Sequence, residues 1–289
     1  MHVTNAEDRA ALANRFRELH RGGELLLLPN VWDAVSAKLY EEEGFAAVGT
    51  TSAGIAATQG FPDGEKMSVE DTARVVRTIV RHVRIPVSAD IEAGYSRRTE
   101  GVVESARVVM EAGAAGINLE DGQPGQGGEP SGRLLPSELQ CERIRAVREM
   151  TTAVGCPLVI NARTDVYLVP EEPARGRLAE AIRRGNLYVD AGADCVFVPD
   201  LGNLSMRAIE NLVTGLGGPL NIIAGEQTPP VGELRRLGVA RLSFGPRPMR
   251  RALSLLQEMA REWVREGTYG RMSGGELTYA KINAWFESS

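Results

Sequence analysis

The chain has 289 residues, which is longer than an average domain but normal for a single α/β barrel. Hydrophobic residues make up 43% and charged residues 25%, a balance typical of a soluble globular protein with a large aliphatic core. The formal net charge of -5 gives no general attraction to nucleic acids or anionic membranes, and no apolar run approaches the roughly 18 residues that suggest a membrane span.

The N-terminal segment and the cysteines indicate a cellular compartment. Residues 1–21 are charged and periodic, and they lack the apolar core of a signal peptide. Cys141, Cys156 and Cys195 lie far apart and form no CxxC pair, so they predict neither a disulfide framework nor a cysteine metal cluster. We therefore expect a cytoplasmic protein.

Short apolar strands alternate with amphipathic helices along the chain. The expected strands cover residues 25–28, 46–50, 86–90, 115–120, 157–161, 194–198, 219–223 and 240–244. Between them, helices are expected over residues 33–43, 69–82, 99–112, 137–150, 174–191 and 205–216. Glycine stands where several of these helices should stop, at Gly44, Gly113, Gly192 and Gly238. Eight alternations predict an α/β fold, a (β/α)8 TIM barrel formed by a single domain over residues 1–289.

Three segments depart from this alternation. Residues 51–66 and 122–133 are rich in Gly and Pro and follow the second and fourth strands, so we expect mobile covers over the active-site face of the barrel. Two further helices are expected over 247–265 and 276–286. They are additional to a minimal barrel, and the tail 246–289 is expected to pack on a neighbouring subunit.

Carboxylates end two neighbouring strands. Asp90 and Glu92 end the third, and Glu120 ends the fourth, each after an apolar run. Alternation along an extended segment puts Asp90 and Glu92 on one side, and adjacent parallel strands bring all three acids together. A hard cation relieves the repulsion among them, so we predict a Mg²⁺ site, with Mn²⁺ as an alternative. Single acids of this kind also occur as solvated loop residues or helix caps.

Two other strand ends carry groups suited to an anionic substrate. Arg163, after the fifth strand, can hold a carboxylate or phosphate with two hydrogen bonds, or form a structural ion pair. The Thr51–Ser52–Ala53 turn offers hydroxyl and backbone N–H donors, although it also fits an ordinary turn. The Gly-rich segment 122–132 has no GxxxxGK[ST] pattern, which excludes a nucleotide P-loop, and no histidine lies near a predicted strand end.

Five motifs in chain order, each at a predicted strand end, are similar to those of the isocitrate lyase and phosphoenolpyruvate mutase superfamily. They cover most of the chain, from about residue 25 to 256, and read LPNVWDA from 28, GTTS from 49, ADIEAGY from 89, NLED from 118 and ARTD from 162.

The resemblance implies roles for individual residues. Asp90, Glu92 and Glu120 match acids that hold Mg²⁺, often through water. Arg163 and the segment Thr51, Ser52 and Ala53 match substrate-binding groups, together with Asp90. Asp63 matches an acid of the mobile loop after the second strand, and Asn221 with Thr228–Pro229 matches the seventh strand end and its loop. Relatives stabilise the enolate of pyruvate or a related oxo acid, and are usually tetramers that exchange a C-terminal helix between subunits. The resemblance therefore implies a homo-oligomer, a homotetramer or a dimer.

The chain departs from the family in the loop after Glu120. The C–C lyases carry a Lys-Arg-Cys-Gly-His segment there, whereas this loop has no Cys, Lys or His. The Lys and Asn of the mutases are also missing, and Pro199 replaces a lyase glutamate beside Asp200. Glu92 stands where many members have Asp. Cys141 lies inside a predicted helix and is expected to be inert.

We therefore expect a Mg²⁺-dependent lyase or hydrolase that cleaves a C–C bond in a small α-oxo or hydroxy carboxylate through an enolate-like intermediate. Decarboxylation, retro-aldol cleavage and oxaloacetate-type hydrolysis all fit. The candidates for catalysis are Arg163, Asp63 and Tyr95, and the group that moves the proton is Asp63, Tyr95 or a metal-bound water. Two alternatives remain: C–P chemistry on phosphoenolpyruvate or phosphonopyruvate, and a non-catalytic protein that binds an oxo acid.

Overall fold

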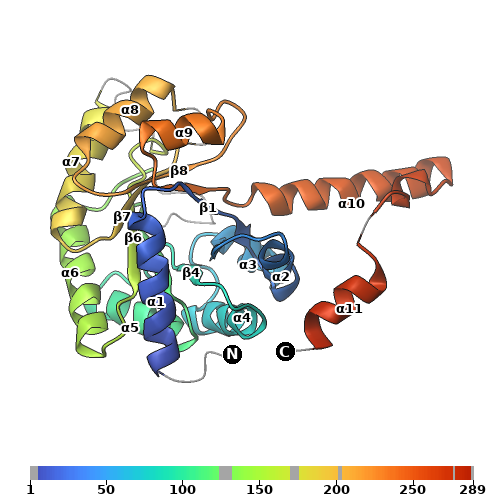
Figure 1. Ribbon diagram of the computed structural model, residues 1–289, viewed down its shortest axis with the longest axis horizontal. Coiled ribbons are helices and arrows are strands. Elements are labelled where there is room, and N and C mark those ends of the chain that lie inside the picture. Colours follow the sequence, from blue (N-terminus) through green and yellow to red (C-terminus); the bar gives the residue numbers. More distant parts are fainter. Residues whose placement is uncertain (1–5, 124–131, 170–175, 201–203, 276, 288–289) are drawn as a thin grey trace. The chain divides into compact units, whose positions relative to one another are not determined.

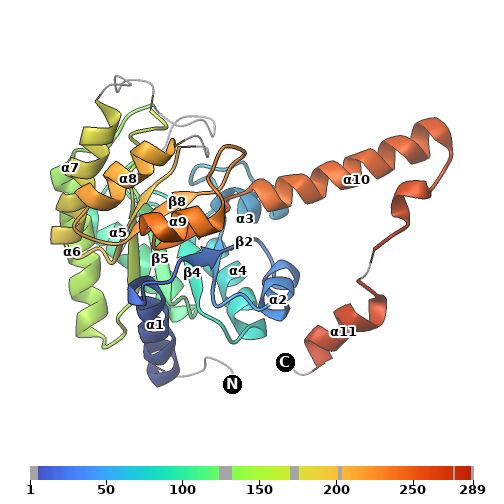
Figure 2. The ribbon, with the colours of Figure 1, turned by 45° about the horizontal axis from the view of Figure 1, so that its top comes forward.

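The computed structural model describes residues 6–123, 132–169, 176–200, 204–275 and 277–287. Contacts divide the chain into two units, Met1–Gly245 and Pro246–Ser289. The first unit holds every strand of the described residues, surrounded by helices (Figures 1 and 2). The boundary falls at the start of the tail that was expected to be additional to the barrel.

The first unit is a nearly closed barrel of nine parallel strands. The strands are β1 (Leu26–Leu28), β2 (Asn30–Val31), β3 (Val48–Thr50), β4 (Val87–Asp90), β5 (Gly116–Glu120), β6 (Val159–Arg163), β7 (Cys195–Val198), β8 (Leu220–Ile223) and β9 (Arg241–Ser243). Their order is β1-β9-β8-β7-β6-β5-β4-β3-β2. Because β1 pairs with β9 and β2 pairs with β3, the segment around Pro29 joins the two edges of the sheet. The predicted TIM barrel is confirmed, with its first strand split in two at Pro29, which has no backbone N–H to donate.

The helices of the first unit include the six that were predicted between strands and three more, over residues 6–21, 52–58 and 231–237. They are α1 (Ala6–Arg21), α2 (Ala34–Glu42), α3 (Ser52–Thr58), α4 (Val69–His82), α5 (Thr99–Glu111), α6 (Ser137–Ala153), α7 (Arg177–Asp190), α8 (Met206–Gly215) and α9 (Val231–Leu237). The four glycines predicted to end helices all have a positive φ, for example 105° at Gly113 and 88° at Gly238. Glycine adopts this left-handed conformation without the steric cost of a Cβ, so the chain can leave each helix and enter the next strand.

The segment after β3 corrects one expectation. We predicted a mobile cover over residues 51–66, but its first half is the helix α3, in which Ile55 and Ala56 are buried. Thr51 caps this helix by accepting a hydrogen bond from the Gly54 backbone at 3.5 Å. Small residues that resembled a loop thus form a packed helix. Residues 124–131 of the second expected cover lie outside the described residues.

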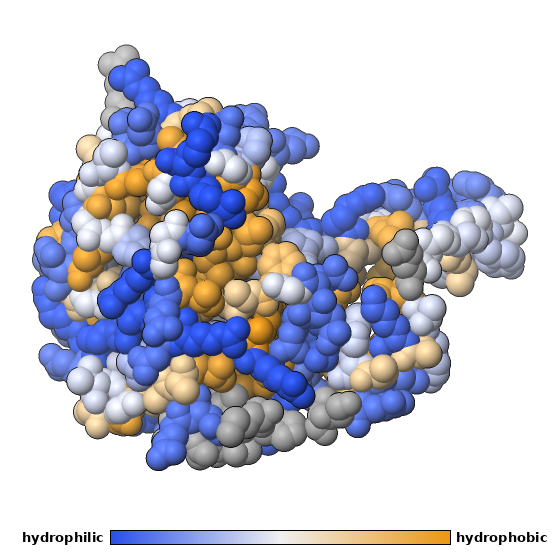
Figure 3. Space-filling model, viewed as in Figure 1, coloured by the Kyte–Doolittle hydropathy of each residue, from blue (hydrophilic) through white to orange (hydrophobic). Residues whose placement is uncertain are grey.

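Helix α1 packs at the amino ends of the strands. Phe16 is fully buried in a cluster with Leu28, Ala115 and Val159. An apolar hollow is lined by Leu19 of α1, by Leu25 and Leu27 at the start of β1, and by Phe45 and Ala46 before β3. In the space-filling view, apolar side chains gather in the middle of this face (Figure 3). The acids of the predicted site stand at the other, carboxyl ends of the strands.

The second unit contains α10 (Arg247–Glu266), a short 3-10 helix (Gly270–Met272) and α11 (Tyr279–Glu287). Glu262 joins the first two, because its carboxylate accepts hydrogen bonds from the Thr268 hydroxyl at 2.7 Å and from the Gly270 and Arg271 backbones. Among the described residues of both units, no helix combines the length and the apolar character that crossing a membrane requires.

Candidate active site

Three adjacent strands end in charged residues. Asp90, Glu120 and Arg163 are the last residues of β4, β5 and β6. Glu120 lies beside Arg163 in the strand register, and Asp90 lies beside Asn118, two residues before Glu120. The apolar residues before them are buried in the sheet, which fixes the strands and leaves the polar groups at the carboxyl edge.

Asp90 is held by donors from three neighbouring segments. Its Oδ2 accepts a hydrogen bond from the Ser52 backbone N–H at 3.2 Å, at the start of α3. Its Oδ1 accepts from the Asn118 amide at 3.0 Å and from the Glu92 backbone N–H at 3.4 Å. The Asp90 backbone N–H donates in turn to the Thr50 hydroxyl at 2.8 Å. The carboxylate is therefore fixed relative to β3 and β5.

Glu92 and Tyr95 follow β4 in a strained loop. Glu92, Tyr95 and Glu65 have φ values of 51°, 56° and 59°, and they are the three non-glycine residues with positive φ among those described. The Glu65 backbone N–H donates to Glu92 Oε2 at 2.8 Å, and Glu65 Oε1 accepts from the Tyr95 backbone at 2.7 Å. Strained backbone of this kind persists where the surroundings hold it, and it gathers at functional sites. The role of Glu65 in shaping this loop was not predicted.

The acids of the site raise one another's pKa. Burial, followed by the charges of Asp63, Asp90 and Glu65, raises the pKa of Glu92 to about 8. Burial and the charge of Asp90 also raise the pKa of Asp63, although a hydrogen bond from the Ser52 side chain partly opposes this. Burial raises the pKa of Glu120 well above its usual value despite the nearby Arg163. The site therefore gathers more carboxyl groups than Arg163 pairs with, and part of them is protonated.

Arg163 is held by two acids. Its Nε and Nη2 donate to the two oxygens of Asp165 at 2.5 and 3.0 Å, and its Nη1 lies 2.6 Å from Glu120 Oε2. Burial lowers the pKa of Arg163, but the charges of Asp165 and Glu120 outweigh it, and the pKa is raised. The Arg163 side chain is 20% exposed, so part of the guanidinium remains accessible to a ligand. The central guanidinium carbon of Arg163 lies 6.0 Å from the centroid of the Phe197 ring.

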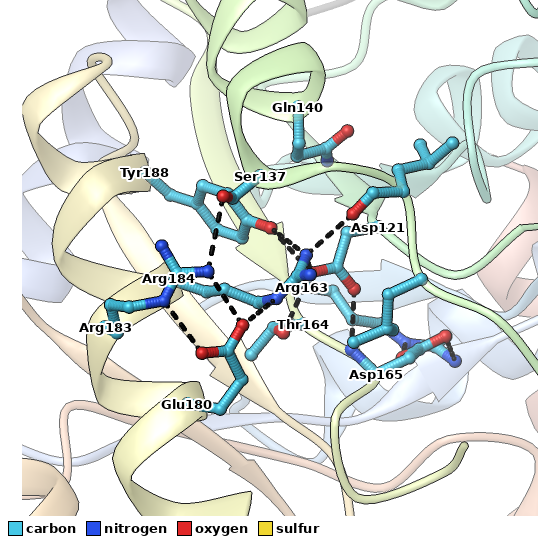
Figure 4. Close-up of polar contacts among 12 residues, drawn as sticks. Asp121, Ser137, Gln140, Arg163, Thr164, Asp165, Glu180, Arg183, Arg184 and Tyr188 are labelled. Atoms are coloured by element: carbon cyan, nitrogen blue, oxygen red, sulfur yellow. Dashed lines mark hydrogen bonds and ion pairs between the residues drawn. The ribbon is translucent and has the colours of Figure 1, made fainter. Parts of the chain in front are cut away.

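A buried network stands behind this arginine (Figure 4). Asp121 is fully buried, and its Oδ1 accepts from the Asp165 backbone N–H at 2.8 Å. Its Oδ2 accepts from the hydroxyls of Thr164 and Tyr188 at 2.9 and 2.6 Å and from Arg184 at 3.1 Å. The network connects the ends of β5 and β6 to α7, and so fixes Asp165, the partner of Arg163. The sequence showed Asp121 beside Glu120 but did not indicate this role.

The donor set suits a hydrated divalent ion. Among the residues that the structure describes, no three metal-ligating side chains are grouped closely enough to form a direct three-ligand centre. Asp90, Glu92 and Glu120 nevertheless lie near one another, because the charge of Asp90 raises the pKa of both glutamates and the charge of Glu92 raises the pKa of Glu120. Mg²⁺ keeps several of its waters in proteins, so these oxygen donors fit an ion held largely through water.

The structure brings most of the predicted residues together. Ser52, Asp63, Asp90, Glu92, Tyr95, Glu120 and Arg163 are connected by hydrogen bonds or by charge. The Tyr95 hydroxyl lies 3.5 Å from Glu92 Oε1 and 3.1 Å from the Thr72 hydroxyl, and burial raises its pKa. Thr51 and Ala53 belong to the start of α3, where the Thr51 side chain caps the helix.

Asn221 is placed elsewhere. It is the second residue of β8, is fully buried, and its Oδ1 accepts a hydrogen bond from the Ser243 hydroxyl at 3.1 Å. Thr228 lies in the loop after β8, where its hydroxyl accepts from the Gly225 backbone at 2.8 Å. Cys141 lies in α6 and is buried, and burial raises the pKa of its thiol, in agreement with an inert side chain.

Comparison with known families decides the relationship that the motifs indicated. The family model described as phosphoenolpyruvate phosphomutase matches residues 16–264. The chain belongs to this family. The match covers the barrel and most of α10, and it confirms the resemblance to the isocitrate lyase and phosphoenolpyruvate mutase superfamily.

Individual members of the family match along most of the chain. Uncharacterized protein Rv1998c from Mycobacterium tuberculosis strain H37Rv is 32% identical over 246 residues, 85% of this chain and 87% of that protein. The 2,3-dimethylmalate lyase of Eubacterium barkeri is 31% identical over 233 residues, 78% of this chain and 77% of that protein. A crystal structure from Burkholderia cenocepacia J2315, provisionally named a lyase/mutase, is 32% identical, covers 98% of both chains and has a TM-score of 0.86. The superfamily comprises C–C lyases and mutases, and its chemistry indicates a carbon–carbon lyase.

Proposed function

We propose that this chain is a divalent-metal-dependent lyase or hydrolase that cleaves a C–C bond in a small α-oxo or hydroxy carboxylate. The observation that carries the proposal is the group of acids at the ends of β4 and β5, faced by Arg163 from β6. Its surplus of carboxyl oxygens suits a cation, and the arginine suits a substrate carboxylate. The 2,3-dimethylmalate lyase among the relatives supports C–C chemistry.

Asp90, Glu92 and Glu120 would hold the ion. When bound, a Mg²⁺ or Mn²⁺ ion would supply positive charge for the enolate oxygen that develops as the C–C bond breaks. Arg163 would bind a carboxylate of the substrate with the N–H groups that it now shares between Asp165 and Glu120. The Ser52 backbone N–H holds Asp90 in place, and so keeps the acid next to α3.

Proton movement would fall to Asp63 or Tyr95. The raised pKa of Asp63 makes its carboxylate a stronger base than an exposed aspartate, which suits removal of a proton from a substrate hydroxyl. The raised pKa of Tyr95 keeps its phenol neutral, so it can donate a proton to the enolate carbon but cannot begin as a base. The Thr72 hydroxyl and Glu92 orient the phenol.

The test is turnover of a panel of small oxo and hydroxy acids with Mg²⁺ or Mn²⁺, with release of pyruvate, CO₂ or oxalate measured against a chelator control. We expect Asp90→Asn to lower kcat/KM at least about 100-fold, because loss of an outer-shell partner of a metal site alone costs about 10–100-fold. Asp71→Asn is the matched control, since Asp71 lies in the first turn of α4 and pairs there with Ser68 and Arg74.

Two results would reject the proposal. One is the absence of turnover with every acid while an oxo acid still binds and raises the melting temperature, which would identify a non-catalytic binding protein. The other is equal activity of Asp90→Asn and the wild type.

Phosphorus chemistry is the second candidate, because the matching family model is described as phosphoenolpyruvate phosphomutase. The same acids and arginine would then serve phosphoenolpyruvate or phosphonopyruvate. Phosphorus NMR of the reaction mixture separates the two candidates, since a mutase moves the resonance from a phosphate ester to a phosphonate and a C–C lyase leaves it unchanged.

A further inference from the structure

The interior of the barrel contains a row of polar side chains beneath Asp90. Strand register places Asp90, Asn118 and Asn161 side by side on β4, β5 and β6. On β8 and β9, Asn221 lies beside Arg241, and Ser243 follows Arg241 by two residues. Because neighbours in register and residues two apart share one face, all six side chains lie on the same face of the sheet. Barrel interiors are more often filled with branched apolar residues.

One end of this row is fixed by Arg241. Arginine has donors and no acceptor, so its Nε donates to the Ser243 oxygen at 3.3 Å. The Ser243 hydroxyl proton is then available for Asn221 Oδ1 at 3.1 Å. With its oxygen engaged, Asn221 has its Nδ2 left as a donor. That nitrogen is buried and has no hydrogen-bond partner among the described residues.

The other end is fixed by Asp90. An ionised carboxylate only accepts, so Asn118 must turn its nitrogen toward Asp90 Oδ1, at 3.0 Å. Asn118 Oδ1 consequently accepts from Asn161 Nδ2 at 2.9 Å. This leaves Asn161 Oδ1 as a buried acceptor, again with no partner in the part of the chain that the structure describes.

The two ends therefore leave one donor and one acceptor that complement each other. Strand β7 separates Asn161 from Asn221 and offers Cys195 and Phe197 on this face, of which only the thiol is a weak donor. Ser88 Oγ and Arg241 Nη1 on the same face are also buried and unpaired within the described chain. Buried polar groups in folded proteins are almost always hydrogen-bonded, and buried waters commonly supply about three such bonds each.

We propose that a buried water molecule bridges Asn221 and Asn161, and that Asn221 and Asn161 are positioning residues for Asp90. The water accepts a hydrogen bond from Asn221 Nδ2 and donates one to Asn161 Oδ1. Every hydrogen bond in the completed chain then donates in one direction, from the buried guanidinium of Arg241 to the carboxylate of Asp90. Arg241 is 3% exposed, and its positive charge is opposed by Asp90 through this row.

This proposal gives Asn221 a role other than direct contact with substrate. Through the water, the Asn221 amide fixes the orientation of the Asn161 amide, which in turn fixes that of Asn118. Asn118 then holds Asp90 Oδ1, the oxygen that does not contact Ser52. The inference rests on the proposed function only in that Asp90 is taken as a metal-ligating acid.

The water itself is tested by a crystal structure of the wild-type protein at a resolution that shows ordered solvent. We expect a water within about 3.2 Å of both Asn221 Nδ2 and Asn161 Oδ1. A direct contact between the two amides, or a dry interior with the amides turned to other partners, would overturn the bridge.

The positioning role is tested by Asn221→Leu, which keeps the number and branching of the side-chain heavy atoms and removes the hydrogen-bonding groups. We expect the affinity for Mn²⁺, measured by calorimetry, to fall about tenfold, and the EPR spectrum of bound Mn²⁺ to change, because outer-shell groups orient the ligands of a metal. Asn186→Leu is the matched control. Asn186 joins α7 to Gly215 and Gly217 with two hydrogen bonds, so its loss removes as many bonds but leaves Asp90 untouched.

A second variant covers the case in which Asn221→Leu does not fold. Ser243→Ala removes one hydroxyl and leaves the Asn221 amide free to turn over, so it should lower Mn²⁺ affinity by a smaller factor, roughly threefold. Unchanged Mn²⁺ affinity in the folded variants would overturn the positioning role, as would a wild type that binds no Mn²⁺. If the wild type binds Mn²⁺ but converts no oxo acid, the proposed function fails. The positioning role of Asn221 is still tested in that case, because it is measured by Mn²⁺ affinity.

Discussion

Glu92 is the acid of the site whose ionised form is most clearly destabilised, by burial and by neighbouring carboxylates. It is 8% exposed, has a positive φ and faces Asp63, Asp90 and Glu65, yet no cation is paired with it among the described residues. Its raised pKa means that the folded protein keeps a proton on Glu92 under conditions in which an unfolded chain has lost it. Stability at neutral pH is thereby reduced, which is a cost that functional sites commonly impose.

The sign of the pH dependence follows from that pKa of about 8. A carboxyl group whose folded pKa is raised contributes its stabilisation below the unfolded pKa, near 4.5, and loses it as the pH rises toward 8. Glutamine mimics the protonated form at every pH. We therefore expect Glu92→Gln to match the metal-free wild type in melting temperature near pH 4.5 and to exceed it by several degrees at pH 8.5.

Differential scanning calorimetry across this pH range, with a chelator present, measures the effect. Glu100→Gln serves as the control, because the side chain of Glu100 is 76% exposed and no such difference should develop. If the difference in melting temperature between Glu92→Gln and the wild type stays constant with pH, ionisation of Glu92 does not destabilise the folded protein.

The buried network around Asp121 connects the ends of β5 and β6 to α7. Leu135, beyond residues 124–131, also joins it: the Leu135 backbone N–H donates to the Asp121 carbonyl at 2.7 Å, and the Leu135 carbonyl accepts from Arg184 at 2.9 Å. Gly122 and Leu134 form an antiparallel bridge beside it. The same acid thus fixes both the base of the segment after β5 and the partner of Arg163.

Removing one donor from this network should be costly. Tyr188→Phe leaves a fully buried carboxylate oxygen without its 2.6 Å hydroxyl partner, so we expect the free energy of unfolding to fall by roughly 1–3 kcal/mol. Urea denaturation at one pH gives this value. Tyr40→Phe is the control, because Tyr40 is only half-buried, packs edge-on against Phe45, and donates no hydroxyl hydrogen bond within the described residues. Equal small losses in both variants would contradict a structural role for the Tyr188 hydroxyl.

Eight of the nine strands could be predicted from the sequence to within two residues at either end, because buried parallel strands are continuous apolar runs bounded by proline and glycine, whereas β2 (Asn30–Val31) was missed. Pro86, Pro157 and Pro219 precede three of them, and glycines close the preceding helices. Helix α3 was missed, since its small residues give no helical pattern, and only the Thr51 cap and the burial of Ile55 define it.

The site could be predicted as far as strand ends determine it. Asp90, Glu120 and Arg163 follow from position along the chain, since each ends a strand of one parallel sheet. The contacts of Glu65 with Glu92 and Tyr95 could not be predicted. They depend on a positive φ at these three residues, and none of them is a glycine that would indicate it in the sequence. The interior position of Asn221 depends on strand register, which the motif alone does not give.

The second unit exposes large apolar side chains on its long helix α10. On α10, Leu253 is 51% exposed, Leu256 57% and Trp263 40%, and their spacing places them on one face of the helix. Exposed apolar faces of this kind commonly mark protein–protein contacts. We propose that this face of α10 packs on a neighbouring copy of the chain, as the family resemblance implies.

The prediction is a change in assembly. Leu253→Glu with Leu256→Glu places two charges on the apolar face, and burying unpaired charge at an interface is unfavourable, so we expect the oligomer to dissociate toward smaller species in light scattering after size exclusion. Arg251→Glu adds the same side chain on the opposite face of α10 and should leave the mass unchanged. The barrel should retain its melting transition in the double variant, since Pro246–Ser289 forms a separate unit. A wild type that is already monomeric, or a double variant with the wild-type mass, would show that this face has another role.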